Sequence, residues 1–187
     1  MTRPELWPRR TDRLELRLPN EAEVDSVLAW RHHPDVTRWL LRTEVDPEVY
    51  RGMWRTGATD PLDHHVVAMD DAGAVVGTLS LQVHDGMGQG TASPAVGSEG
   101  SLGYLLDPAH HGRGYATEMV CAALDLAFGD LGLHRVTAGC FAANTASWRV
   151  MEKAGMRREQ HGVRDSWHAE LGWVDGYTYA VLSDDPR

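Results

Sequence analysis

The sequence DPAHHGRGYATEM, residues 107–119, places two glycines between an apolar segment and a helical one. Residues 99–107 become increasingly apolar, which predicts a strand. From Val120 to Leu131 apolar side chains recur three and four apart, which predicts a helix. Gly112 and Gly114 permit a left-handed backbone and would let an anion approach the free N–H groups at the start of that helix. The stretch is therefore either a tight turn or a phosphate-binding loop.

Two common phosphate loops do not fit this sequence. A Walker loop ends in Gly-Lys-Ser/Thr, which is absent here. A dinucleotide-binding fingerprint requires Gly or Ala where Thr117 stands, early in a βαβ unit. Here the stretch follows a predicted hairpin and lies beyond the midpoint of the chain.

The remaining patterns predict a mixed α/β sheet in a single domain, residues 1–187. Strand–helix–strand over residues 102–141 implies parallel neighbours, whereas runs 66–69 and 75–83 around the turn DDAG imply an antiparallel hairpin. Pro34 is expected to end the first helix, which Asn20 caps. The other predicted elements are a strand in 11–18, helices over 21–33, 47–54 and 144–155, a strand over 133–141 and two closing antiparallel strands.

Composition limits the classes of function. The formal net charge of −9 argues against nucleic-acid binding, which needs clustered Lys and Arg. No apolar run is long enough to span a membrane, and the N-terminus lacks the apolar core of a signal peptide. Cys121 and Cys140 are too few for a disulfide framework, so we expect reduced thiols and a cytoplasmic protein.

The segment HGRGYA, residues 111–116, resembles the acyl-CoA pyrophosphate loop of the GNAT superfamily of N-acetyltransferases, whose pattern is Gln/Arg-x-x-Gly-x-Gly/Ala. His111 stands at the Gln/Arg position. TDRLELR, AWRHHPDVTRWL, NTASWRVMEKAGMRRE and GWVDGYTYAVL extend the likeness to residues 11–182 and are similar to the RimJ/RimL-like branch, which acetylates ribosomal-protein N-termini. The implied GNAT fold is a mixed, mostly antiparallel sheet with a parallel βαβ acyl-CoA-binding core, flanked by helices.

The resemblance implies acetyl-CoA as co-substrate and no metal. A backbone N–H near Leu105 and Leu106 would stabilise the thioester oxyanion, and the strand before the loop would separate from strand 136–140 to admit pantetheine. The residues implied in acetyl-CoA binding are Leu105, Leu106, His111, Gly112, Arg113, Gly114, Tyr115, Ala116, Thr117, Asn144 and Ser147.

Direct attack of an amine on a thioester requires a base for the amine and an acid for the leaving thiolate. Glu99 is the first candidate base; Asp85, His84 or a chain of waters are the alternatives. Met151 replaces the tyrosine acid that is common in the superfamily. Ser147 takes the acid's role by resemblance, with Asn144 holding the pantetheine arm, although both residue types are also frequent helix caps.

The acceptor implied by the branch is a protein N-terminal α-amine; a small cationic amine of the aminoglycoside or polyamine type is the alternative. Trp30 and Trp39 belong to the region that forms one wall of the acceptor site. The Gly-rich segment 86–98 would enter that region as a lid or as a contact in a possible homodimer, or is a tolerated insertion. A non-catalytic acyl-CoA-binding module is the competing class, because Met151 cannot donate a proton.

Overall fold

The structure, a computed structural model, describes residues 6–57, 60–90 and 93–186. Their strands form one eight-stranded sheet of order β1-β2-β3-β4-β5-β6-β8-β7. The strands are β1 (Arg9–Arg10), β2 (Leu14–Arg17), β3 (Asp63–Asp70), β4 (Val75–His84), β5 (Glu99–Leu106), β6 (Arg135–Phe141), β7 (Arg157–His168) and β8 (Gly172–Leu182). The helices are α1 (Glu21–Arg31), α2 (Pro34–Thr37), α3 (Pro47–Gly57), α4 (Tyr115–Asp125) and α5 (Thr145–Lys153), with a 3-10 turn at Pro108–His110 and a π-helical turn at Leu126–Asp130.

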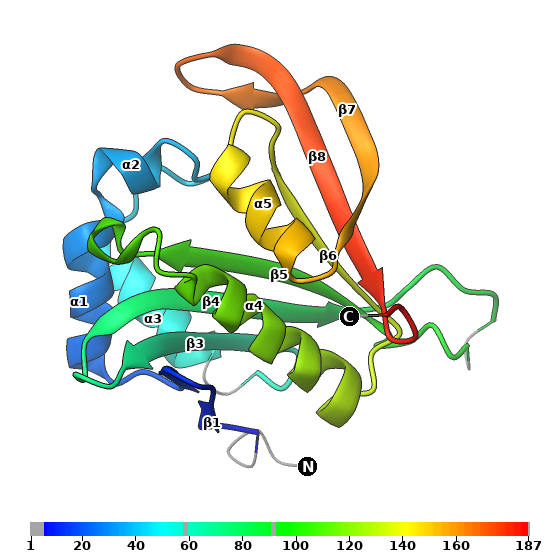
Figure 1. Cartoon of the computed structure of the whole chain (residues 1–187), viewed down its shortest axis with the longest axis horizontal. Coiled ribbons are helices and arrows are strands. Elements are labelled where there is room, and N and C mark those ends of the chain that lie inside the picture. Colours follow the sequence, from blue (N-terminus) through cyan, green and yellow to red (C-terminus); the bar gives the residue numbers. More distant parts are fainter. Residues whose placement is uncertain (1–5, 58–59, 91–92, 187) are drawn as a thin grey trace.

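The predicted α/β class and mixed sheet are confirmed. Only the β5–β6 pair is parallel in the described sheet; the other pairs are antiparallel. A crossover helix, α4, joins the two parallel strands, as the strand–helix–strand pattern predicts. Figure 1 shows α4 in front of the sheet and the β7–β8 hairpin rising away from the other strands.

The parallel pair is short, and this creates the central opening of the fold. β5 pairs with β6 at three positions only, Glu99–Arg135, Gly100–Val136 and Ser101–Thr137. β6 stays paired with β8 as far as Phe141, whereas β5 stays paired with β4 as far as Leu106. The two strands therefore separate beyond Ser101, and the sheet divides into two parts that share one narrow seam.

Helices cover the two faces of the sheet with separate apolar clusters. On one face α4 buries Met119, Val120 and Leu124 completely against β3, β4 and β5. On the other face α1 and α3 pack Val27 and Trp54 around Val67 of β3. Residues of β3 whose side chains point to the second face therefore lie under α1 and α3.

Two local features differ from the sequence prediction. Pro34 does not only follow α1; it opens α2, because proline is well tolerated at the first helical position, and His33 caps this helix by accepting from the Asp35 N–H. The described parts of segment 86–98, residues 86–90 and 93–98, do not enter the region of α2. Figure 1 shows them beyond the far end of β4, because β4 runs away from α2 before the chain turns back into β5.

Among the described residues, no helix is both long and apolar enough to cross a membrane.

Candidate active site

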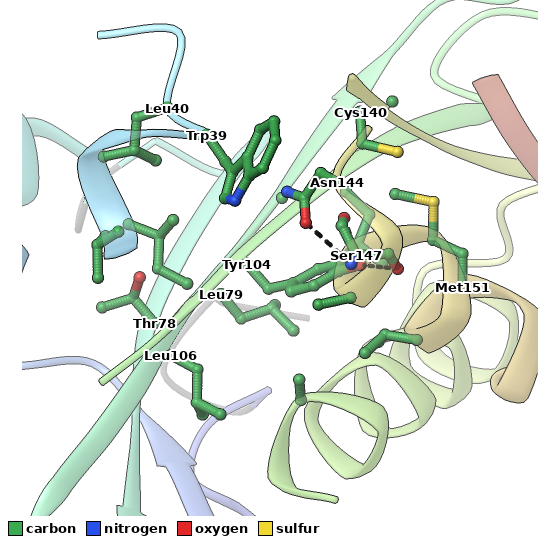
Figure 2. Close-up of a pocket in the computed structure, with 18 of the residues that line it drawn as sticks. Trp39, Leu40, Thr78, Leu79, Tyr104, Leu106, Cys140, Asn144, Ser147 and Met151 are labelled. Carbon is green, nitrogen blue, oxygen red and sulfur yellow. Dashed lines mark hydrogen bonds between the residues drawn. The ribbon is translucent and has the colours of Figure 1, made fainter. Parts of the chain in front are cut away.

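A cleft of about 1330 Å³ opens where β5 and β6 separate. At one end it is lined by α1, α2, the α2–α3 connection and α3, and at the other by the start of α4 and by α5. We call these the α2 end and the α4 end. Figure 2 shows Trp39 and Leu40 on one side of the pocket, Ser147 and Met151 of α5 on the other, and Tyr104 between them.

The glycine loop of residues 111–116 lies at the α4 end. Gly112 and Gly114 have φ angles of +75° and +83°, a region in which a β-carbon is strained. Gly114 is the N-cap of α4 and contributes no side-chain hydrogen bond. The first N–H groups of α4, from Tyr115, Ala116 and Thr117, have no intrahelical acceptor, and these three residues line the cleft. An anion such as a pyrophosphate fits this arrangement.

The side chains of His111 and Arg113 do not point toward the place that an anion would occupy at the start of α4. The Nε2 atom of His111 lies 3.3 Å from the Leu106 carbonyl oxygen, so the imidazole folds back onto β5. The Arg113 side chain is exposed and does not line the cleft. His111 still lines the cleft, and the loop adds the backbone N–H groups at the start of α4.

Arg13 holds the loop from behind, a contact that the sequence did not indicate. Its Nη1 donates to the Arg113 carbonyl oxygen over 2.8 Å, and its guanidinium lies 4.8 Å from the centre of the Tyr115 ring. Glu118 of α4 pairs with the same guanidinium at 2.6 Å and also accepts from the Arg13 backbone N–H. Arg13 thus fixes the first turn of α4 against the segment before β2.

Replacing Arg13 by glutamine is expected to raise the Kd for acetyl-CoA about threefold to tenfold, on the order of 1 kcal/mol, because the loop loses its outer support. Isothermal calorimetry measures this change. Arg10→Gln is the matched control, since the exposed Arg10 side chain pairs with Glu15 of the neighbouring strand. Equal affinities of both variants would remove the supporting role of Arg13.

The backbone of β5 offers a donor to the gap between β5 and β6. The Asp107 N–H, directly after β5, donates to the carbonyl oxygen of Val76 in β4. Because successive backbone groups alternate along a strand, the N–H of Leu106 points away from β4 and into the gap, and that of Leu105 points toward β4. Of the two predicted oxyanion donors, the geometry therefore favours Leu106.

Ser147 and Asn144 meet at the start of α5. The Asn144 side chain caps the helix by accepting from the Ser147 N–H at 3.2 Å. Figure 2 shows the Asn144 amide nitrogen directed away from Ser147. Capping thus uses the amide oxygen of Asn144 and the backbone of Ser147, which leaves the amide nitrogen and the Ser147 hydroxyl for other partners.

Tyr104 of β5 joins Ser147, and the sequence did not indicate this pair. The Tyr104 hydroxyl donates to the Ser147 carbonyl oxygen at 2.8 Å and lies 3.0 Å from Ser147 Oγ. Burial raises the pKa of Tyr104 to about 12, against the opposing effect of the Ser147 hydrogen bond. Burial also raises the pKa of the neighbouring Cys140 thiol. Met151 of α5 is buried, and the tyrosine hydroxyl beside Ser147 comes instead from β5.

The three predicted bases lie outside the cleft. Glu99, at the start of β5, is 3.8 Å from Arg135 across the seam. His84 Nε2 lies 3.0 Å from Ser101 Oγ, and Asp85 accepts from the Gly97 N–H at 2.7 Å. Glu99 is paired with His84 of β4, and Glu99 comes before Ser101, the last residue of β5 that pairs with β6. The three residues therefore lie at the closed end of the seam.

The α2 end combines aromatic and cationic side chains. Trp39 lines it and lies 5.4 Å from the His168 ring, whereas Trp30 does not line the cleft. Arg31 is only 5% exposed; its Nη2 donates to the Arg42 carbonyl oxygen and its guanidinium lies 5.3 Å from the Tyr50 ring. The charged residues lining this end are Arg31, Asp35, Arg38 and Arg42. Cationic groups prevail there although the whole chain is acidic.

Within the described ranges, no three His, Cys, Asp or Glu side chains gather in a way that could hold a metal ion, and neither Cys121 nor Cys140 forms a disulfide.

Residues 13–157 match the family model described as the acetyltransferase (GNAT) domain. The chain is 36% identical over 152 residues to the probable N-acetyltransferase YjcK of Bacillus subtilis. The aligned residues cover 80% of this chain and 70% of the relative. The chain therefore belongs to the GNAT family and is an acetyl-CoA-dependent acetyltransferase.

Solved structures share the fold at lower identity. Spermidine N-acetyltransferase from Vibrio cholerae, in complex with CoA and spermine, superposes with a TM-score of 0.78 at 15% identity, covering 94% of this chain and 98% of that one. Ribosomal-protein-S5-alanine acetyltransferase from Vibrio fischeri gives 0.77 at 18% identity, covering 97% and 99%. The two neighbours act on different classes of amine, so the fold by itself does not select the acceptor.

Proposed function

We propose that this chain, residues 1–187 as one domain, transfers the acetyl group of acetyl-CoA to the α-amine of a protein N-terminus, in the manner of the RimJ/RimL-like branch. The α2 end of the cleft carries this proposal. Its helices and the α2–α3 connection present Arg31, Arg38 and Arg42 together with the carboxylate of Asp35, and Arg38 also lies 3.8 Å from Glu170.

The same charges disfavour the alternative acceptor. A polyamine or an aminoglycoside carries several positive charges and needs carboxylates around it, since like charges repel in a partly desolvated site. A peptide N-terminus brings one ammonium group and a chain of neutral amides. The acidic surface of the whole protein can still attract cationic ribosomal proteins at long range.

The chain's residues divide the chemical work. The N–H groups at the start of α4 and the positive-φ loop hold the pyrophosphate, and the Asn144 amide nitrogen meets the pantetheine arm. The Leu106 N–H stabilises the oxyanion as the amine attacks. Ser147, hydrogen-bonded to Tyr104, gives a proton to the departing thiolate. Bound acetyl-CoA supplies the thioester that makes this transfer favourable.

A panel of acceptors tests the proposal. Peptides with free N-termini, the same peptides with blocked N-termini, spermidine and an aminoglycoside are each incubated with acetyl-CoA, and the released CoA thiol is measured. We expect turnover with free peptides only. A higher kcat/KM for spermidine or the aminoglycoside than for every free peptide would contradict the proposed acceptor class.

A further inference from the structure

His65 of β3 reaches the cleft with a carboxylate behind it. Its Nε2 lies 2.8 Å from Asp63 Oδ1, two residues earlier on the same face of the strand. Both side chains are about two-thirds buried or more. The Asp63 carboxylate at this distance favours a proton on Nε2, which would leave the lone pair on Nδ1. His65 itself lines the cleft.

The register places His65 in a row that leads to the opening between β5 and β6. His65 is paired with Ser80 of β4, and Ser80 with Gly103 of β5. Paired residues point to the same face, so all three lie on the face covered by α1 and α3. Two inter-strand spacings, about 10 Å, separate the backbones of His65 and Gly103. The imidazole and an acceptor amine together span this distance.

Gly103 keeps the row open. A β-carbon at this position would lie 2.8 Å from Ser80 Oγ, so a side chain here would push the hydroxyl away. The Ser80 hydroxyl leans over β5 toward the Gly103 carbonyl oxygen, at 3.5 Å. The Gly103 carbonyl oxygen, the Ser80 hydroxyl and His65 therefore form a continuous polar surface under α1 and α3.

The groups that face His65 are few. Trp54 of α3 meets its ring edge-on, with ring centres 5.6 Å apart. Tyr50 of α3 and Arg31 of α1 are the titratable or cationic residues of the helices above it that line the same cleft. Asp63 is the carboxylate in contact with the imidazole. By comparison, Glu99, His84 and Asp85 have their partners elsewhere.

We propose that His65, held by Asp63, is the general base that accepts a proton from the acceptor amine, directly or through one water beside Ser80. The ammonium form of the amine loses this proton to Nδ1, and the neutral nitrogen forms a C–N bond with the acetyl carbon. As the C–S bond breaks, Ser147 gives its proton to the departing thiolate, and the second proton lost by the amine nitrogen returns to Ser147 through water, so that the hydroxyl is restored. The imidazolium then releases its proton to solvent, so one proton is freed in each turnover.

The proposal rests on the acetyl-transfer activity and does not depend on which amine is the acceptor. Parent, His65→Gln and Asp63→Asn are compared with the best amine of the acceptor panel. We expect kcat to fall about 100-fold in His65→Gln and about tenfold in Asp63→Asn, as for loss of general acid–base catalysis, with an unchanged Kd for acetyl-CoA. The pH profile of His65→Gln should rise with the fraction of neutral amine, whereas the parent reaches a plateau.

His161→Gln is the matched control, because His161 forms the same kind of pair with Asp175, at 2.6 Å, outside the cleft. Added imidazole should restore turnover to His65→Ala, which a purely structural role of His65 would not produce. A His65→Gln variant with parental kcat and pH profile would overturn the proposal.

Acetyl-CoA hydrolysis, with water in place of the amine, is measured in parallel for every variant. A parent that hydrolyses acetyl-CoA but acetylates no amine of the panel would contradict the acceptor class. In that case a lower hydrolysis rate in His65→Gln would still support the base, and an unchanged rate would overturn it.

Discussion

Gly114→Glu is expected to weaken acetyl-CoA binding by about 100-fold or more, which is on the order of 3 kcal/mol. Gly114 adopts φ +83° as the N-cap of α4, so any side chain strains the turn. Glutamate adds a negative charge beside the N–H groups that would hold the pyrophosphate, and like charges repel strongly in a partly buried site. Calorimetric titration with acetyl-CoA measures the loss.

Gly73→Glu is the control that separates strain from the site. Gly73 lies in the β3–β4 turn with φ +78°, and no heavy atom lies within 4 Å of a β-carbon built there. The two variants therefore carry similar backbone strain and the same added charge. We expect Gly73→Glu to bind acetyl-CoA as the parent does. Parental affinity in Gly114→Glu would mean that residues 111–116 form only a turn.

Ser147→Ala is expected to lower kcat about tenfold or more while the Kd for acetyl-CoA changes little. The substitution removes only the hydroxyl: the cap to Asn144 uses the Ser147 backbone N–H, and Tyr104 keeps its bond to the Ser147 carbonyl oxygen. The helix start should thus remain intact. Ser26→Ala, an exposed serine of α1, is the control, and an unchanged kcat in Ser147→Ala would remove this hydroxyl from the mechanism.

Tyr104→Phe completes this test. If the two hydroxyls act as one proton-donating unit, the double variant should be no slower than the slower single variant, which a double-mutant cycle detects. Because burial raises the pKa of Tyr104 to about 12, its hydroxyl stays protonated through the neutral and mildly alkaline range. Between pH 7 and pH 10 the parent should therefore show no loss of kcat from ionisation of Tyr104.

Local patterns predicted most of the fold. The glycines of the loop, the Asn20 cap of α1 and the alternation of the hairpin each act over a few residues, so the sequence alone reveals them. Asn20 and Glu23 indeed form the reciprocal capping box at the start of α1. The parallel crossover follows from the order of elements, because strands joined by a helix lie parallel.

Contacts between distant segments could not be predicted in this way. Arg13 reaches Arg113, which is 100 residues away, and Tyr104 reaches Ser147, which is 43 residues away. Glu99 illustrates the same difficulty: its position at the start of a strand is visible in the sequence, but the distance from the opening depends on where β5 leaves β6. The Asp63–His65 contact is two residues apart in the sequence, but its place in the cleft depends on the pairing of β3 with β4 and of β4 with β5.

The narrow seam between β5 and β6 has a mechanical consequence. Three paired positions join the two parts of the sheet. A small rotation of one part about this seam would change the width of the cleft more than it changes the spacing of the paired strands. Arg135 bridges the seam as a brace, with Glu99 on one side and Glu159 of β7 on the other. In this structure Glu99 thus joins an ion-pair network across the seam. Acetyl-CoA bound between the two parts of the sheet would then hold the cleft at one width.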